Sequence, residues 1–255
     1  MKKLLWISLL LAACNSGDKP ADKQSASTAA PSSGTSVAAG GCNKMIFFKE
    51  GAEIDSKTYD GNGKETGSQH TKIVSVNDDG GITVATAQST DTAGSGKPFE
   101  VNYKCDGKKI YVDVASVLNN AAKNKSGKFE ATPVEYPIDI TEGETLPDMD
   151  GTMNMEANGK TTRVKYHFKN RKVEGKEDIT TPAGTFSCYK ITNSVETEMD
   201  MPGMTEQMKK VMETMKDKFK MSSVTWFAPS FGILKSETYL NGKLQSSNEI
   251  VGYKE

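Results

Sequence analysis

The chain has 255 residues, of which 36% are hydrophobic, and its 32 basic and 33 acidic side chains give a formal net charge of −1. This near-neutral balance argues against nucleic-acid binding, because no basic stripe is present and arginine occurs only at Arg163 and Arg171. Composition therefore favours an ordinary folded protein with no nucleic-acid partner.

The N-terminus has the pattern of a secretory signal. Lys2 and Lys3 precede a short apolar run that ends in Leu11-Ala12-Ala13-Cys14, and this run is too short to span a bilayer as a helix. The similarity to bacterial lipoprotein signals implies that residues 1–13 are a signal peptide and that Cys14 is acylated. Several acyl chains on one residue hold a protein stably at a membrane. We expect a lipid-anchored protein of the bacterial cell envelope, with the outer membrane as the preferred location.

Residues 15–41 predict a flexible tether. They are rich in small and polar side chains and contain no aromatic residue, so they bury too little apolar surface to offset the entropy of ordering. As a coil they reach roughly 25–30 Å. Together with Cys14 they form a lipidated tether over residues 14–41, and residues 42–255 are long enough for a single domain with one core.

Three cysteines remain in the folded part if Cys14 is acylated. In an oxidising compartment Cys42, Cys105 and Cys188 allow one disulfide and one free thiol. We predict the pair Cys42–Cys105, because Cys42 opens the domain and Cys105 ends a strand. The alternative, in which all three are reduced and buried, stays open. No Cys-x-x-Cys pair is present to indicate a zinc ribbon or a redox motif.

Alternation of apolar and polar residues dominates the domain. Phe99, Val101, Tyr103 and Cys105 interleave with polar residues, as in a half-buried antiparallel strand. Turn sequences such as Asp106-Gly107 tolerate the positive φ that tight hairpins need. The pattern predicts a meander, with strands near residues 45–50, 53–60, 66–77, 82–91, 98–105, 108–113, 129–135, 151–158, 161–174, 184–197, 222–229, 232–240 and 243–251.

Two segments have a helical period instead. Residues 114–123 predict a short helix. Residues 204–219 predict an amphipathic helix of about four turns, with Thr205 as a possible N-cap and charged residues on the other face. The residues of its apolar face recur at intervals of three and four: Met204, Met208, Val211, Met212, Met215 and Phe219.

The methionines of this helix have three interpretations. They could pack an ordinary core, line an apolar ligand cavity, or bind Cu(I) through their thioethers. The shared stripe with Val211 and Phe219 is typical of a packing face and makes copper the weakest of the three. The first two stay open.

Catalytic motifs are not evident. His70 and His167 read as solvated or hydrogen-bonded strand residues, and no Gly-x-Ser-x-Gly nucleophile elbow occurs. Aspartate pairs such as Asp148 and Asp150 fall where turns normally place them, although such carboxylates could in principle act as acid and base. We therefore expect no enzyme activity, no metal and no cofactor.

The C-terminal half resembles a known group of proteins. The segments Gly175–Ile191 (GKEDITTPAGTFSCYKI) and Trp226–Glu237 (WFAPSFGILKSE) are similar to the TapB-like bacterial envelope proteins, and residues 42–51, 59–64 and 103–107 fit the same pattern. That group looks distantly like the lipoprotein localisation factors, whose fold is a curved, half-open antiparallel barrel closed by helices. The resemblance implies this fold for most of residues 42–255 and supplies no catalytic residues. The Met-rich insertion, residues 199–221, departs from it.

Taken together, these patterns predict an α+β protein that is mainly β: a curved antiparallel meander sheet, or half-open barrel, packed against one or two helices. The expected function is non-catalytic binding of a lipid-like or other apolar ligand. The residues predicted to line its site are Met204, Met208, Met212, Met215 and Phe219. The alternative is a structural or assembly module that binds another envelope protein. In either case the membrane is contacted through acylated Cys14.

Overall fold

The protein is described here by a computed structural model covering residues 41–92, 98–113, 115, 119, 127–157, 160–201, 203–216 and 220–255. Cys14 and residues 1–40 lie outside these ranges. The described chain begins with two 3-10 helices, η1 (Cys42–Lys44) and η2 (Ile46–Phe48), and continues into one large sheet. A longer helix, α2 (Glu206–Lys216), follows the tenth strand. Among the described residues, no helix is long and apolar enough to cross a membrane.

The sheet accounts for most of the described chain. Its thirteen strands are β1 (Glu53–Asp60), β2 (Glu65–Asp79), β3 (Ile82–Asp91), β4 (Pro98–Cys105), β5 (Lys109–Val112), β6 (Gly127–Ala131), β7 (Val134–Pro137), β8 (Met149–Ala157), β9 (Lys160–Thr181), β10 (Gly184–Asp200), β11 (Met221–Ala228), β12 (Gly232–Leu240) and β13 (Lys243–Lys254). All pair antiparallel, in the order β6-β8-β9-β10-β11-β12-β13-β1-β2-β3-β4-β5-β7. The predicted curved antiparallel meander is confirmed.

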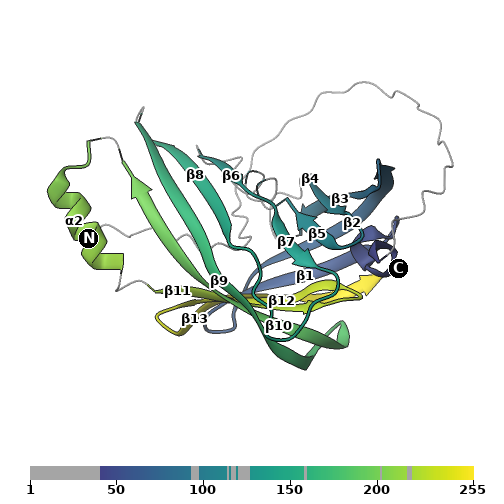
Figure 1. The fold of residues 1–255 in the computed structure, drawn as a ribbon. Coiled ribbons are helices and arrows are strands. Elements are labelled where there is room, and N and C mark those ends of the chain that lie inside the picture. Colours follow the sequence, from purple (N-terminus) through teal and green to yellow (C-terminus); the bar gives the residue numbers. More distant parts are fainter. Residues whose placement is uncertain are drawn as a thin grey trace, which may run out of the picture.

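The two ends of the sheet are joined by one segment of chain. β6 pairs with β8 at one end and β7 pairs with β5 at the other, although only Thr132 and Pro133 separate β6 from β7. One short segment can reach both ends only if the sheet curves until they approach each other. Figure 1 shows this curvature, with β6 and β8 facing β3, β4 and β5 across the concave side. We call residues 127–137 the seam.

The seam explains one wrong prediction. The sequence predicts a single strand over residues 129–135, but Pro133 has no N–H to donate and the chain changes partner there. The predicted strand over residues 45–50 is also wrong, because η2 forms there instead. Met45, Ile46 and Phe48 are all buried, and such consecutive burial suits a compact turn better than an alternating strand. The helix predicted over residues 114–123 lies largely outside the described residues.

The residues before β1 cover one end of the concave face, and we call residues 42–48 the N-terminal plug. The predicted disulfide between Cys42 and Cys105 is present and ties the plug to β4. The ring of Phe47 contacts Tyr103 at 4.8 Å and Phe231 at 6.3 Å between centroids. Aromatic packing and a covalent bond therefore fix the plug against the sheet.

Gly232 makes room for the plug. It has a φ of +108°, and a Cβ atom there would lie 2.8 Å from Cε2 of Phe47. Gly232→Ala should lower the free energy of unfolding by about 2 kcal/mol, from backbone strain plus displacement of the ring. Chemical denaturation measures this. Gly242→Ala is the matched control, since Gly242 has a φ of +76° and open space around it. Equal losses in the two variants would contradict a steric role for Phe47.

Candidate functional site

The concave side of the sheet encloses a cavity of about 360 Å³. Its walls come from the N-terminal plug, from the seam and from strands on both halves of the sheet, β1, β2, β4 and β5 as well as β8 to β13. Binding sites for small molecules usually have volumes of about 300–1,000 Å³ and are mostly apolar. The cavity is thus large enough for one small ligand.

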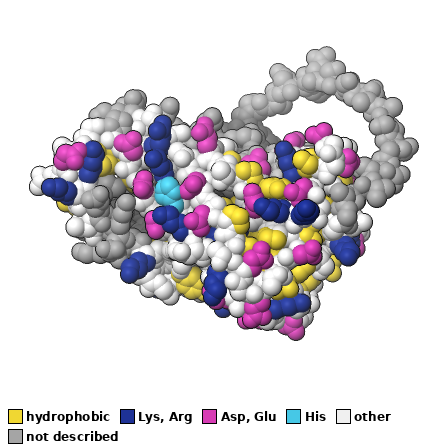
Figure 2. Space-filling view, in the orientation of Figure 1, with side chains coloured by type: hydrophobic (Ala, Val, Ile, Leu, Met, Phe, Trp, Pro, Cys, Tyr) yellow, Lys and Arg dark blue, Asp and Glu magenta, His cyan; other side chains and the backbone are white. Residues whose placement is uncertain are grey.

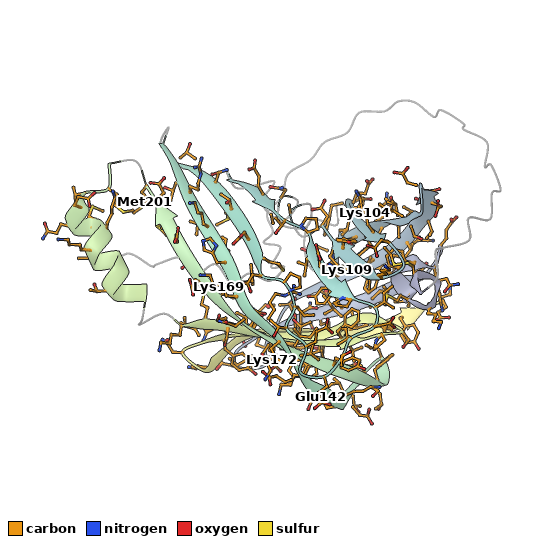
Figure 3. The ribbon with its side chains drawn as sticks, viewed as in Figure 1. Lys104, Lys109, Glu142, Lys169, Lys172 and Met201 are labelled. Carbon is orange, nitrogen blue, oxygen red and sulfur yellow. A yellow bond between two sulfur atoms is a disulfide. The ribbon has the colours of Figure 1, made fainter. Side chains whose placement is uncertain are left out.

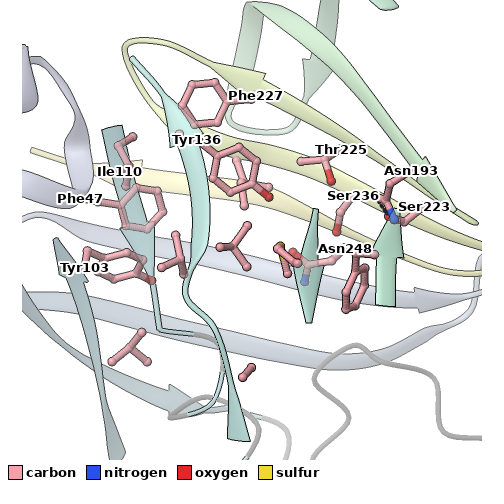
Figure 4. Close-up of a pocket in the computed structure, with 18 of the residues that line it drawn as sticks. Phe47, Tyr103, Ile110, Tyr136, Asn193, Ser223, Thr225, Phe227, Ser236 and Asn248 are labelled. Atoms are coloured by element: carbon pink, nitrogen blue, oxygen red, sulfur yellow. Dashed lines mark hydrogen bonds between the residues drawn. The ribbon is translucent and has the colours of Figure 1, made fainter. Parts of the chain in front are cut away.

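The cavity has an apolar end and a polar row. Phe47, Tyr103 and Ile110 form the apolar end beside the plug (Figure 4). The polar row lies on neighbouring strands and consists of Asn193, Ser223, Thr225, Ser236 and Asn248.

Strand register brings the polar row together. Asn193 is opposite Ser223, Thr225 is opposite Ser236, and Ser236 is in turn opposite Asn248. The Ser223 hydroxyl donates to Oδ1 of Asn193 at 2.6 Å. An amphiphilic lining of this kind can hold one apolar and one polar part of a ligand.

Arg171 is the one cationic residue in the described lining of the cavity. It lies on β9 and is only 3% exposed. Its guanidinium donates to the carbonyl oxygens of Pro147 at 2.8 Å and Glu135 at 2.9 Å, so it bridges from β9 to the seam. Its Cζ atom also lies 5.4 Å from the ring centroid of Tyr136. These contacts fix the guanidinium in the cavity wall.

A β-bulge turns Arg171 inward. Ser194 pairs with Lys169 and Thr192 pairs with Lys172, so Asn170 and Arg171 together face the single residue Asn193. Asn170 takes the positive φ of 56° that such a bulge needs, and asparagine tolerates it. Lys169 and Lys172, which flank the bulge, are labelled in Figure 3.

The parity of β9 changes at this bulge. Before it, the inward residues are Val164, Tyr166 and Phe168, at even numbers. After it, they are Arg171 and Val173, at odd numbers. A bulge commonly re-aims a side chain near a functional site.

Tyr136 stands between the two ends of the cavity. Its ring stacks on Phe227 at 5.2 Å, and Figure 4 shows its hydroxyl directed toward Thr225. Burial raises the pKa of Tyr136, while the charge of Arg171 and hydrogen bonds from Thr225 and Arg171 oppose that rise. The phenol therefore stays protonated at neutral pH and links Arg171 to the polar row.

The acidic residues near Arg171 have other partners. Asp150 pairs with His167 at 2.5 Å, Glu237 pairs with Lys235 at 2.8 Å, and the Glu135 carboxylate pairs with Lys109 at 2.8 Å. No carboxylate of the described residues forms an ion pair with Arg171. The described residues also contain no group of three or more His, Cys, Asp or Glu side chains that could hold a metal ion.

The Met-rich helix α2 forms within the predicted residues 204–219, but its described residues do not line the cavity. α2 lies apart from the concave face (Figure 1) and packs closely against no strand within the described chain. Met208 is 47% exposed, and neither Met204 nor Met208 lines the cavity. The side chains of Met212 and Met215, and all of Phe219, lie outside the described residues. Amphipathicity identified an apolar face but not the surface that it meets.

Met208→Lys tests this placement of α2. Since the side chain is largely exposed, the substitution should change the free energy of unfolding by no more than about 0.5 kcal/mol. Chemical denaturation of both proteins provides the comparison. A loss of several kcal/mol would restore the interpretation of α2 as a covering helix. The N-cap itself is confirmed, because the Met208 N–H donates to Oγ1 of Thr205 at 3.3 Å.

Cys188 is the remaining cysteine of the described chain, and it is free and buried. Burial, followed by the charges of Asp178 and Glu177, raises the pKa of its thiol to about 11. At pH 8 only about one part in a thousand is thiolate, the reactive form. Iodoacetamide should therefore modify native Cys188 far more slowly than unfolded Cys188, as peptide mass spectrometry would measure. Equal rates would contradict burial.

The surface carries charges of both signs. Figure 2 shows basic and acidic side chains interspersed on one face, without a continuous patch of either sign. His70 pairs with Asp55 at 2.8 Å, so both histidines have a carboxylate partner in the sheet. Both pairs agree with the prediction that His70 and His167 are hydrogen-bonded strand residues.

Comparisons with known proteins agree on the fold. The profile of a family described as DUF3108-like matches residues 49–250. A crystal structure of an exported protein with a YmcC-like fold from Bacteroides fragilis is 23% identical, with a TM-score of 0.60, and covers 83% of this chain and 100% of its own. A lipoprotein from Parabacteroides distasonis is 20% identical, with a TM-score of 0.62, and covers 82% and 99%. No curated protein matches the sequence.

Proposed function

Because the chain belongs to the DUF3108-like family and its sheet encloses a mainly apolar cavity, we propose that it is a non-catalytic envelope lipoprotein that binds an apolar ligand inside the curved sheet. The single observation that carries this proposal is the cavity of about 360 Å³.

The envelope location rests on the sequence. The Leu11-Ala12-Ala13-Cys14 pattern supports acylation of Cys14, with the tether over residues 14–41 holding the domain away from the bilayer. The description of the Parabacteroides relative as a lipoprotein supports the same location. Attachment to the outer membrane, and a distant relation to the TapB-like group and the lipoprotein localisation factors, remain part of the proposal.

The ligand site differs from the one that the sequence predicted. The cavity lies under the N-terminal plug and the seam, and α2 is remote from it. A ligand there would contact the apolar end formed by Phe47, Tyr103 and Ile110. Burial of a hydrocarbon chain against such residues is favourable by about 0.8 kcal/mol per methylene group.

Photo-crosslinking tests the proposal in the full-length protein. Membrane vesicles carrying the protein are irradiated with dodecanol that bears a diazirine in its chain, and labelled peptides are mapped by mass spectrometry. We expect labels on cavity-lining strands such as β11 and β12. Ser236→Phe, which fills the polar row, should remove them.

The control places the same ring outside the cavity. Ser222 is on β11 and is not a lining residue, so Ser222→Phe should leave the labelling pattern unchanged. Labels confined to residues outside the cavity, or equal labelling in wild type and Ser236→Phe, would refute binding inside the sheet.

A second candidate function is an assembly module that contacts another envelope protein. It is favoured by the exposure of Met208 at 47% and Val211 at 53% on α2, because exposed apolar side chains often mark contact sites. A photoreactive amino acid at position 211 in membranes should then crosslink to one defined protein. Absence of any protein crosslink there would remove this candidate.

A further inference from the structure

Arg171 has no direct carboxylate partner among the described residues that line the cavity. An arginine keeps its positive charge at any physiological pH, and Arg171 is 3% exposed. Its hydrogen-bond partners, the carbonyls of Pro147 and Glu135, are neutral. Burying a charge is costly unless an opposite charge accompanies it. The neighbouring carboxylates of Glu135, Asp150 and Glu237 contact Lys109, His167 and Lys235 respectively, and none of them contacts the guanidinium directly in the described chain.

An arginine at position 171 favours a carboxylate ligand more than a lysine would. The chain has 32 basic side chains, and only Arg163 and Arg171 are arginines. A lysine would supply the charge, but a planar guanidinium additionally matches a carboxylate with two parallel hydrogen bonds. A bulge at Asn170 directs this one arginine into the cavity, whereas strict alternation after Phe168 would have turned it out.

The surroundings of Arg171 suit an amphiphile. Tyr136 contacts the guanidinium with its ring and stacks on Phe227, so the cationic position borders directly on aromatic surface. The apolar end continues from there to the N-terminal plug, and the polar row begins at Thr225 on the other side. A molecule with a charged head and a single hydrocarbon chain fits both parts of the lining.

We propose that the cavity binds a single-chain amphiphile with a carboxylate head, such as a fatty acid, with the carboxylate at the Arg171 guanidinium and the chain along the apolar end. This inference rests on the proposed function, since it requires a ligand inside the sheet. A carboxylate is favoured over a phosphate because one cation balances one negative charge, and Arg171 is the one cation in the described lining.

The experiment compares probes that differ only in the head group. The full-length protein in vesicles is irradiated with diazirine-bearing dodecanoate, dodecanol, dodecylammonium or dodecyl phosphate at about pH 8, where the carboxylate and the ammonium are both charged. Labelling of cavity peptides is measured against probe concentration. We expect dodecanoate to half-saturate at a concentration about tenfold lower than dodecanol, as one charge-assisted hydrogen bond allows, and dodecylammonium to label least.

A pair of variants isolates the charge without removing Arg171. Thr225 and Arg171 both make a hydrogen bond to the side chain of Tyr136, so Thr225 lies close to the guanidinium. Thr225→Asp supplies an internal carboxylate, and Thr225→Asn has nearly the same shape without the charge. Dodecanoate should bind Thr225→Asp about tenfold more weakly than Thr225→Asn, whereas dodecanol should bind both alike. Ser222→Asp adds the same charge outside the cavity and should retain the preference of the wild type.

The outcomes separate this inference from the proposed function. Equal labelling of the cavity by dodecanoate and dodecanol, with no difference between Thr225→Asp and Thr225→Asn, would overturn the carboxylate assignment and leave apolar binding intact. Preference for dodecyl phosphate over dodecanoate would also overturn it. If no probe labels cavity peptides, the proposed function itself fails.

Discussion

Removing the Cys42–Cys105 disulfide is expected to lower the free energy of unfolding by about 4 kcal/mol, because the bond closes a long loop and so restricts the unfolded chain. The two cysteines are 63 positions apart and both are fully buried. The double variant Cys42→Ala, Cys105→Ala should also release the N-terminal plug, which covers one end of the cavity through Phe47. Chemical denaturation without reductant measures the loss.

Two controls accompany this prediction. Cys188→Ala removes a buried thiol that forms no disulfide and should cost much less. Denaturation of the wild type in the presence of a reductant should approach the curve of the double variant, whereas the double variant should be insensitive to reductant. A double variant no less stable than Cys188→Ala would show that the bond contributes nothing to stability.

Arg171→Ala should have the second largest effect, a loss of about 3 kcal/mol. The substitution removes the two hydrogen bonds from the guanidinium to the carbonyls of Pro147 and Glu135, each worth about 1.5 kcal/mol or more because the donor is charged, and removes the contact with the Tyr136 ring. Relief from burying an unbalanced charge offsets part of this cost. Because Arg171 connects β9 to the seam, we expect the ends of the sheet to separate more readily.

Arg163→Ala provides the matched comparison. Arg163 also lies on β9, but it is exposed and its Nε donates to the side chain of Asn154 in a surface hydrogen bond. Its removal should change the free energy of unfolding by no more than about 0.5 kcal/mol. Hydrogen exchange of β7 and β8 amides should increase in Arg171→Ala and not in Arg163→Ala. Equal behaviour of the two variants would exclude a bridging role for Arg171.

The two roles of Arg171 are compatible. A residue that holds the seam and also faces the cavity would couple ligand binding to the closure of the sheet. A carboxylate at the guanidinium would balance its charge, and the bound state would be stabilised by mass action. We therefore expect dodecanoate to raise the midpoint of unfolding of the wild type, and to raise it less in Thr225→Asp.

Local signals in the sequence located most strands. Alternation in Phe99, Val101, Tyr103 and Cys105 identified β4, and turn residues such as Asp106-Gly107 marked the hairpins, because side-chain period and positive φ depend on neighbouring residues only. The cap at Thr205 was predictable for the same reason. The disulfide between Cys42 and Cys105 was one of two alternatives, and the fold decided between them by bringing η1 against the end of β4.

The candidate site was missed because its residues depend on tertiary structure. In the sequence, Ser223, Thr225 and Ser236 look like ordinary solvent-facing polar positions of a strand. Because the sheet curves, the face that carries them becomes the concave face that lines the cavity. One signal was available for Arg171: the inward positions shift from Phe168 to Val173, which implies a bulge between them. Strict alternation would have placed Arg171 outside.

By itself, the sequence determined the export signal pattern, the mainly β class, the hairpin turns and the existence of an amphipathic helix, since each of these follows from a short stretch of chain. Tertiary structure alone decided how far the sheet curves, which segment joins its two ends, and where α2 lies relative to the cavity. It also placed a buried arginine charge beside an apolar cavity. These features arise from pairing between residues far apart in the chain, which no local pattern encodes.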